Sequence, residues 1–302
     1  MGKHYYSLNE YYKQKFDRKV YKLSISGTMT CPNRDGTLGS KGCIFCSEGG
    51  SGEFAASSAL SIIEQLNIAM DKVKSKTRDN AYIAYFQPFT NTYADADYLR
   101  RIYYEAIEPE YIVGLSIATR PDCLEDDKIK LLAEINKVKP VSVELGLQSI
   151  HEKTAEYIRR GYTLDKYDDA VNRLKEAEIN VVTHVIIGLP NETEEMILDT
   201  VKYVGQRTDG IKLQLLHVLE KTDLAEEYRA GKFETLSLEK YTDILCKAIE
   251  LLPPGVVIHR ITGDGDKRSL ISPLWSGDKK KVLNYINKEL DKRNIIQGRN
   301  LI

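Results

Sequence analysis

The chain has 302 residues, a formal net charge of −1 and 42% hydrophobic residues. This length and apolar fraction suit one large α/β domain or two small ones. No apolar run approaches the roughly 18 residues of a membrane span, and a near-zero net charge does not indicate a nucleic-acid binder. Five cysteines, an odd number, without an N-terminal apolar run argue against a secreted disulfide framework and predict a cytoplasmic protein.

Short apolar runs recur along the chain, each followed by a charged stretch with helical spacing. Strand and helix pairs in strict succession predict a parallel sheet with right-handed crossovers. No Gly-x-Gly-x-x-Gly follows the first strand, which disfavours a dinucleotide-binding sheet. We predict an α/β fold, a partial (β/α)6 barrel of parallel strands at 21–252, with extensions at 1–20 and 253–302. The expected pairs are 21–26 with 60–73, 81–87 with 96–106, 111–118 with 125–135, 141–148 with 164–177, 180–188 with 194–204 and 211–218 with 238–252.

Three cysteines follow the first predicted strand, in the run Cys31-Pro-Asn-Arg-Asp-Gly-Thr-Leu-Gly-Ser-Lys-Gly-Cys43-Ile-Phe-Cys46. Three thiolates can hold three corners of a four-iron cluster and leave one iron open to a second molecule. The pair Cys43-x-x-Cys46 would also fit zinc, but no fourth Cys or His lies nearby to complete a tetrahedral site. Frequent glycines suit a loop wrapped round a bulky inorganic centre. The run predicts an iron-sulfur cluster held by Cys31, Cys43 and Cys46, with zinc or unliganded thiols as alternatives.

Polar residues gather where the predicted strands end, which is where a barrel carries its chemistry. Glu144 lies inside an apolar strand, where an ionised carboxylate is costly unless it is paired. Because side chains alternate along a strand, Glu144 points to the opposite face from Val143 and Leu145. There it could bind a ligand or form half of a buried ion pair. The strand-end residues are 87–92, 119–123, 148–149, 188–193 and 217. Together they predict one site at the mouth of the barrel.

Both ends of the chain mix basic residues with tyrosines. Such a mixture can contact phosphates and bases, but solvated helix faces look the same in sequence, so both interpretations stay open. Residues 256–261 are strand-like and precede a charged turn outside the predicted barrel. We expect substrate contacts in this segment, at His259, Arg260, Asp264, Lys267 and Arg268.

Several motifs resemble those of radical S-adenosylmethionine (SAM) enzymes. They are the three-cysteine loop, Glu144-Leu-Gly-Leu-Gln-Ser, Arg159-Arg160-Gly-Tyr-Thr and Ile186-Ile-Gly-Leu-Pro-Asn-Glu-Thr. They are similar to the branch with the catalytic subunit of Elongator and the oxygen-independent coproporphyrinogen oxidases. The first cysteine spacing is eleven residues where most members have three, and residues 87–92 replace the usual Gly-Gly-Glu element.

The resemblance implies a [4Fe-4S] cluster and SAM as cofactors. SAM would chelate the open iron and be cleaved to methionine and a 5′-deoxyadenosyl radical. The resemblance puts Thr90, Asn91 and Thr92 near the amine of SAM, although such residues also cap helices.

Charged groups of SAM need charged or polar partners. Arg159 or Arg160 could pair with its carboxylate, and we expect Arg160 because adjacent helical residues do not face one ligand. Arg120 is either a second anion anchor or a salt-bridge partner of Asp122. Glu144 could hold the ribose hydroxyls or a substrate amine. Further cofactor contacts are expected from Gln87, Gln148, Ser149, Gly188, Leu189, Pro190 and His217.

Two cysteines lie outside the loop. Cys123 follows the third strand, at the predicted mouth, where it could contact substrate or donate a hydrogen atom, or be inert packing. Cys123 and Glu144 are therefore the catalytic candidates. Cys246 falls on the apolar stripe of a helix and is predicted to be core. His184 and His217 are either pocket residues or satisfied core histidines.

The runs Thr30-Cys-Pro-Asn-Arg-Asp-Gly, Cys46-Ser-Glu-Gly-Gly-Ser-Gly-Glu-Phe and Ile258-His-Arg-Ile-Thr-Gly-Asp-Gly-Asp resemble a small bacterial group. That group is associated with the carbon-5 side chain of the wobble uridine in transfer RNA (tRNA). The resemblance implies tRNA as substrate, conversion of carboxymethylaminomethyl to aminomethyl, a flavodoxin- or ferredoxin-type electron donor and no membrane partner. The alternatives are a radical SAM enzyme on a small molecule and a non-enzymatic iron-sulfur redox protein.

Overall fold

The computed structural model describes residues 3–50, 52, 55–76, 79–263, 265 and 267–301. Asp264, an expected substrate contact, lies outside these residues, as do Ser51, Glu53 and Phe54 of the glycine-rich run. The described helices include none with the length and hydrophobicity that a bilayer span requires.

Seven parallel strands form one sheet, in the order β1-β2-β3-β4-β5-β6-β8. The partial barrel of parallel strands is confirmed, and β8 adds a seventh strand beside the six that the sequence predicts. The domain boundaries at residues 20 and 252 stay a prediction. A short antiparallel pair, β7 and β9, lies apart from this sheet. The strands are β1 (Tyr21–Ile25), β2 (Tyr82–Phe86), β3 (Ile112–Thr119), β4 (Val141–Gln148), β5 (Asn180–Ile187), β6 (Gly210–Leu215), β7 (Val218–Leu219), β8 (Val257–Arg260) and β9 (Leu270–Ser272).

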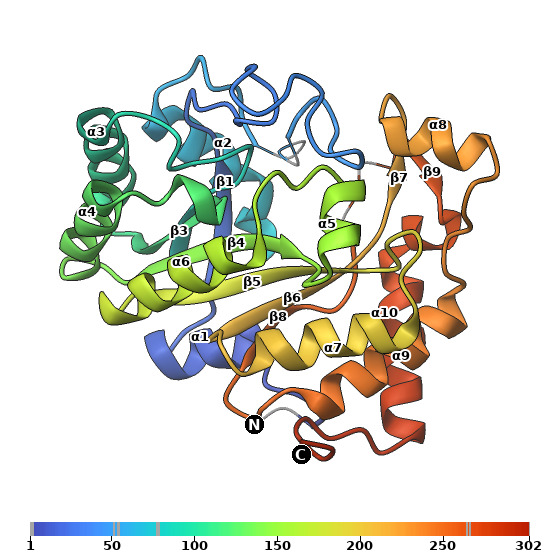
Figure 1. Cartoon of the computed structure of the whole chain (residues 1–302). Helices are drawn as coiled ribbons and strands as arrows, with labels where there is room; N and C mark the ends of the chain where they lie inside the picture. Colours follow the sequence, from blue (N-terminus) through green and yellow to red (C-terminus); the bar gives the residue numbers. More distant parts are fainter. Residues whose placement is uncertain are drawn as a thin grey trace.

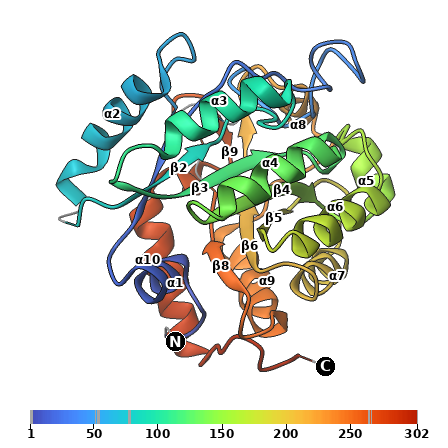
Figure 2. The same cartoon turned by 90° about the vertical axis from the view of Figure 1, so that its left-hand side faces the viewer.

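Helices cover the outer face of the curved sheet (Figures 1 and 2). Several begin at capping residues. At the start of α2 the Ser61 hydroxyl accepts a hydrogen bond from the Glu64 N–H, and the Glu64 carboxylate accepts one from the Ser61 N–H. The sequence did not predict the short helices α5 and α8. The helices are α1 (Leu8–Phe16), α2 (Ile62–Val73), α3 (Ala96–Ile107), α4 (Asp126–Asn136), α5 (Glu152–Tyr157), α6 (Leu164–Glu176), α7 (Glu194–Gly205), α8 (Asp223–Arg229), α9 (Leu238–Leu251) and α10 (Lys279–Lys292), with 3₁₀ turns at η1 (Lys74–Lys76), η2 (Pro121–Cys123) and η3 (Leu274–Gly277).

Alternation along the strands separates the core from the barrel interior. In β4, Val143 and Leu145 are fully buried in the main hydrophobic core, whereas Glu144 and Gly146 line a cavity. Successive side chains of a strand point to opposite faces, so the apolar set packs outward and the other set points inward. Closed barrels of this kind usually fill their interior with branched apolar side chains. Here the inward set is largely polar, and it lines a cavity that could hold a ligand.

The N-terminal segment lies along β8, which is one edge of the sheet. The Ile258 N–H donates to the Tyr6 carbonyl at 2.8 Å, and Ser7 forms a single parallel bridge to the same residue. The Tyr6 N–H in turn donates to the Gln297 side chain at 2.8 Å. These bonds cover an exposed strand edge and bring the two basic ends of the chain together.

Packing against the helices can be tested with Leu145→Ala. This substitution removes a fully buried side chain, and we expect a loss of about 2–5 kcal/mol in the free energy of unfolding. Denaturant unfolding monitored by circular dichroism measures it. Leu274→Ala, at a side chain that is 75% exposed, is the control and should change stability by less than about 0.5 kcal/mol. Equal losses in the two variants would contradict the assignment of the outward face.

Candidate functional site

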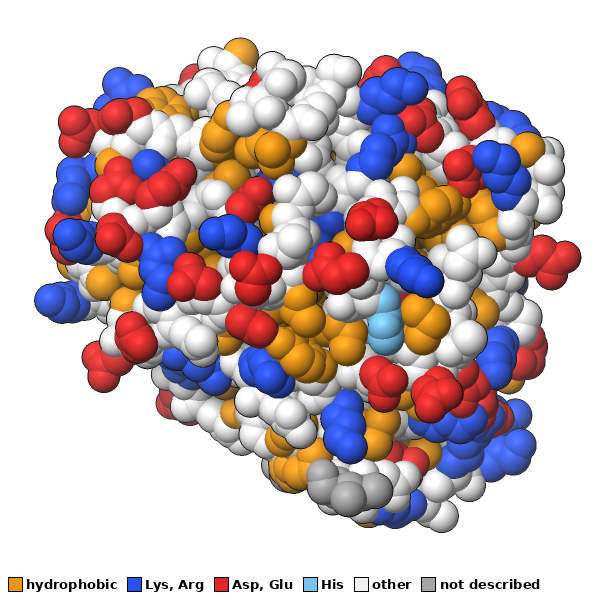
Figure 3. All heavy atoms as spheres, viewed as in Figure 1, with side chains coloured by type: hydrophobic (Ala, Val, Ile, Leu, Met, Phe, Trp, Pro, Cys, Tyr) orange, Lys and Arg blue, Asp and Glu red, His pale blue; other side chains and the backbone are white. Residues whose placement is uncertain are grey.

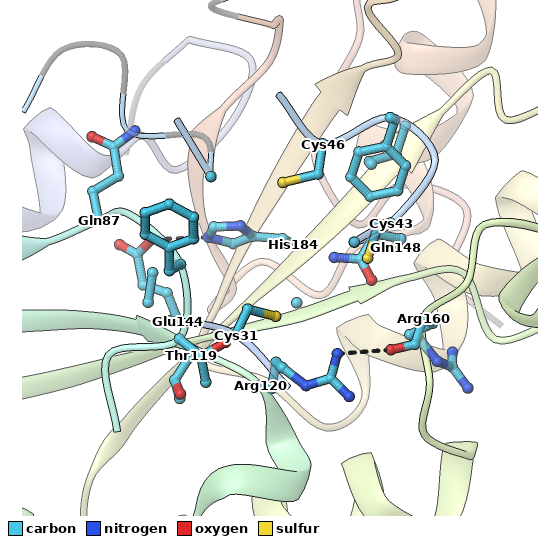
Figure 4. Close-up of a pocket in the computed structure, with 18 of the residues that line it drawn as sticks. Cys31, Cys43, Cys46, Gln87, Thr119, Arg120, Glu144, Gln148, Arg160 and His184 are labelled. Carbon is cyan, nitrogen blue, oxygen red and sulfur yellow. Dashed lines mark hydrogen bonds and ion pairs between the residues drawn. The ribbon is translucent and has the colours of Figure 1, made fainter. Parts of the chain in front are cut away.

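The polar residues at the strand ends surround one cavity of about 200 Å³. It lies under the loop between β1 and α2, the blue segment at the top of Figure 1. In Figure 4 the thiols of Cys31, Cys43 and Cys46 surround the same space as Gln148 and His184. Of the residues singled out from the sequence, those that line the cavity are Cys31, Cys43, Cys46, Gln87, Thr90, Arg120, Glu144, Gln148, Arg160, His184 and Arg260.

Two side chains of the cysteine loop hold it in shape. Asn33 Nδ2 donates to the carbonyl of Arg159 at 2.7 Å and lies 3.5 Å from the sulfur of Cys43. Arg34 donates to the carbonyl of Cys46 at 3.0 Å and also to that of Ser47. The loop is therefore fixed at both of its cysteine-bearing ends without a metal.

The cysteine arrangement fits a polynuclear centre. No three His, Cys, Asp or Glu side chains in the described ranges converge closely enough to hold one metal ion. Burial, together with neighbouring Cys46, raises the pKa of the Cys43 thiol to about 12. A thiolate, the form that ligates metal, therefore needs a compensating cation here. Three separated thiols around one cavity suit the corners of a cluster better than a single zinc ion.

The run after β2 divides into one cavity residue and two structural ones. Thr90 lines the cavity. Asn91 Nδ2 donates to the carbonyls of Phe86, Pro88 and Ala118 at 2.8–3.1 Å. The Thr92 hydroxyl bonds Thr119 Oγ1 at 2.6 Å and the Cys123 carbonyl at 2.5 Å. Asn91 and Thr92 thus fix the loop, and their contact with SAM stays a prediction.

Arg120 and Arg160 both reach the cavity, and both have protein partners. Arg160 is 1% exposed and donates to the carbonyls of Ser149 at 2.7 Å and Tyr162 at 2.9 Å. Arg120 forms a bidentate pair with Asp122 at 2.7 and 2.9 Å and donates to the Arg160 carbonyl at 2.9 Å. The salt bridge that the sequence offered as one alternative for Arg120 is therefore present.

The neighbouring Arg159 points away from this site. It pairs with Asp223 at 2.5 Å and is 34% exposed. The choice of Arg160 over Arg159 as the inward residue agrees with this geometry, while binding of the SAM carboxylate by Arg160 stays a prediction.

Glu144 is fully buried at the inner end of the cavity, where its carboxylate accepts bonds from five side chains. Each donor comes from a different strand. Tyr85 OH lies at 2.8 Å, Ser116 Oγ at 2.9 Å and His184 Nε2 at 2.8 Å. Lys22 and Lys212 complete the set as ion pairs. We call these six residues the Glu144 network; it accounts for most of the lone pairs of the carboxylate.

Burial and neighbouring charges set the protonation states of the network. Burial opposes ionisation of Glu144, but Lys212 and Lys22 outweigh it and hold its pKa well below the usual range. Burial and the charge of Lys212 lower the pKa of His184 to about 4. Burial likewise lowers the pKa of Lys212 to about 7, although Glu144 opposes the shift. The network is an ionised carboxylate beside a neutral histidine.

Other predicted residues lie outside this cavity. Cys123 is 3% exposed, and burial and Asp122 raise the pKa of its thiol to about 12. The Ser149 hydroxyl bonds Glu192. His217 lines an adjoining cavity that shares Gln87 and Arg260 with the first. The turn that follows β5 does not line the first cavity either, and it consists of Gly188, Leu189 and Pro190. Roles for these residues stay predictions.

Sequence reasoning missed most partners of Glu144. The signal was present as an alternation of polar and apolar residues: Lys22, Tyr85, Ser116 and Lys212 each lie between apolar neighbours in their strands. A polar inward face on every strand predicts a polar interior. No such alternation in the sequence indicates the hydrogen bonds of Asn33 and Arg34, because their partners lie in loops.

Comparison with known proteins identifies the class. Residues 27–204 match the Radical SAM superfamily, and residues 208–292 match the Radical_SAM C-terminal domain. YtqA of Bacillus subtilis is 43% identical over 298 residues, 98% of this chain and 92% of YtqA. YhcC of Escherichia coli K12 is 37% identical over 87% of this chain and 84% of YhcC.

More distant relatives share part of the sequence or the fold. Elongator complex protein 3 of Schizosaccharomyces pombe is 32% identical over 157 residues, half of this chain but 28% of that protein. The archaeal Methanocaldococcus infernus Elp3 superposes with a TM-score of 0.69 at 18% identity, over 92% of this chain and 64% of that one. The E. coli coproporphyrinogen III oxidase HemN superposes with a TM-score of 0.50 at 16% identity, over 77% of this chain and 52% of that one. The chain spans less than two thirds of these structures.

The chain belongs to the radical SAM superfamily. Within it, the chain is similar in sequence to part of Elongator complex protein 3 and similar in fold to Elp3 and HemN. Its cofactors are a [4Fe-4S] cluster and SAM, and its chemistry requires a reductant.

Cluster ligation can be tested by single Cys→Ser substitutions at residues 31, 43 and 46. Each should lose most of the iron and acid-labile sulfide that the wild type retains after anaerobic reconstitution, because serine is a poor ligand for iron in such clusters. Metal analysis and visible absorption measure this. Cys123→Ser, at a buried cysteine outside the cavity, is the control and should keep its cluster. Full iron content in the Cys31→Ser protein would contradict the assignment.

The pH dependence of stability tests the neutral state of His184. Between its ordinary pKa near 6.5 and its folded pKa of about 4, the unfolded chain binds a proton that the folded chain excludes. Stability therefore falls as pH drops through this window, by up to about 1.4 kcal/mol per pH unit from one such group. His184→Gln keeps a donor for Glu144 without titrating, so urea unfolding from pH 7 to 4.5 should show a shallower dependence. Equal slopes would refute the assignment.

Proposed function

We propose that the protein is a tRNA-modifying radical SAM enzyme that acts on the carbon-5 side chain of the wobble uridine. The proposed conversion takes a carboxymethylaminomethyl group to an aminomethyl group. The observation that carries an enzymatic role is the continuity of one cavity, from the three cysteines at the strand ends to the Glu144 network in the barrel interior. An electron carrier has no need of such a polar chamber beside its cluster.

In this proposal Cys31, Cys43 and Cys46 hold three irons of the cluster. When bound, the cluster and SAM supply a 5′-deoxyadenosyl radical that removes a hydrogen atom from the substrate. The protein positions both molecules. Thr90 and Gln148 line the cavity beside the cysteines and are our candidates for polar contacts with SAM. Arg160, buried and braced by backbone carbonyls, supplies positive charge for a carboxylate.

The tRNA substrate is supported by the resemblance of the cysteine-loop motifs and by the half of this chain that matches Elongator complex protein 3. The basic ends of the chain, joined through Tyr6 and Gln297, add exposed cations at 13, 15, 18 and 19 and at 279–281. On the face in Figure 3, however, Lys and Arg side chains are interspersed with Asp and Glu. Binding would therefore use local contacts more than a broad basic surface. The electron donor in this proposal is a flavodoxin- or ferredoxin-type protein.

Nucleoside analysis of tRNA from cells lacking the gene tests the substrate. We expect 5-carboxymethylaminomethyluridine to accumulate and its aminomethyl product to be lost. Expression of the wild type should restore the product, and expression of the Cys43→Ser variant should not. An unchanged nucleoside profile would exclude this reaction.

Purified protein separates the alternatives. Reduced, reconstituted protein should form 5′-deoxyadenosine from SAM, and absence of this product would favour a redox protein without enzymatic activity. tRNA binding should weaken as salt rises, because phosphate contacts release counterions. Formation of 5′-deoxyadenosine without salt-dependent tRNA binding would favour a small-molecule substrate.

A further inference from the structure

The charges of the Glu144 network do not balance. Lys22 and Lys212 both pair with the one carboxylate of Glu144. Lys212 is 7% exposed and Glu144 is fully buried, so water screens these charges poorly. An unbalanced charge is costly in such a place. When both lysines are protonated, they share one carboxylate and leave an excess positive charge beside the cavity; burial lowers the pKa of Lys212 to about 7, and a second anion beside Lys212 would favour its charged form.

A third cation lies at the same end. Arg260 of β8 is the register partner of Lys212 of β6, and both side chains line the cavity. Its charge acts on Lys212, Tyr85 and His184, since it shifts the pKa of each.

Hydrogen-bond donors accompany these cations. The side-chain amides of Gln87 and Gln214 line the cavity beside them. Lys212 Nζ also donates to the Tyr85 hydroxyl at 3.1 Å, which helps to hold the lysine in place. A carboxylate has two oxygens that accept several hydrogen bonds and carry one negative charge. It therefore supplies both the acceptors and the charge that this end of the cavity needs.

We propose that the inner end of the cavity is an anion subsite, in which Lys212 and Arg260 bind the carboxylate of the substrate. Glu144 and Lys22 act as positioning residues that hold Lys212 in place. The identity of the anion rests on the proposed function, in which the substrate carries a carboxymethyl group. The subsite fixes the end of that group inside the barrel, so its methylene lies between the carboxylate and the cysteine end of the cavity.

Matched probes test the subsite. The first probe is 5-carboxymethylaminomethyluridine, and the second is its carboxamide analogue, which has the same shape without the negative charge of the carboxylate. In calorimetry with reconstituted protein, the first should bind about tenfold or more tightly than the second. Lys212→Met and Arg260→Gln should each remove this preference. Lys212→Met leaves Glu144 paired one to one with Lys22, which favours a folded variant. Lys130→Met, at an exposed position of α4, is the control and should keep the preference.

SAM also carries a carboxylate, so its affinity is measured on the same proteins. The subsite is supported if Lys212→Met and Arg260→Gln lose the nucleoside preference but keep their affinity for SAM. The unchanged SAM affinity also shows that both variants are folded. A tenfold loss of SAM affinity with the nucleoside preference intact would assign the cations to SAM and overturn the proposal.

Bromide separates failure of the subsite from failure of the proposed function. This ion carries charge without the nucleoside and is located in crystals by anomalous scattering. Bromide between Lys212 and Arg260, in a protein that binds neither nucleoside, would support the subsite and reject the wobble-uridine substrate. Absence of both bromide and carboxylate preference would reject the subsite.

Discussion

The buried carboxylate of Glu144 is the interaction on which the interior of this barrel depends. Its partners come from β1, β2, β3, β5 and β6, so one ionised group ties together side chains from six adjacent strands. Apolar side chains would fill the same space by packing. Charged groups instead require that every member be paired, which fixes their positions but leaves room between them. The cavity exists because the interior is held by hydrogen bonds rather than by packed methyl groups.

The cysteine loop is attached to this frame at a distant point in the sequence. Asn33 bonds the backbone at Arg159, and Arg120 bonds the backbone at Arg160. Gly161, the next residue, has φ +79°, and a Cβ atom there would lie 2.7 Å from the side-chain oxygen of Asn33. The loops after β1, β3 and β4 therefore meet at one crowded point. The position of the cluster is coupled to the sheet by short polar contacts instead of by the loop's own sequence.

Local pattern explains what could be predicted from the sequence. Strand β4 was predicted with its observed bounds because apolar residues alternate strictly along it. The three-cysteine loop stood out by residue type and spacing, and the structure places all three thiols at one cavity. The partners of Glu144 could not be named, because alternation tells which face a residue occupies and not which residue of another strand lies opposite. The structural bonds of Asn91 and Thr92 could not be foreseen for a related reason: polar groups that satisfy a loop's own backbone have the same composition as groups that bind a ligand. Helix α5 has six residues, too few for a helical period to be recognised.

The sheet ends at β1 on one side and β8 on the other, and within the described ranges no ladder joins these two strands. A closed barrel has a fixed circumference, since each strand is bonded on both sides. Here the edge strands can separate or approach without breaking a ladder bond, and the segment that borders β8 is the N-terminal arm at Tyr6 and Ser7. The width of the chamber is therefore not fixed by a closed ring of ladder bonds. A substitution where the N-terminal arm borders β8 would act on that width without touching the cysteine loop.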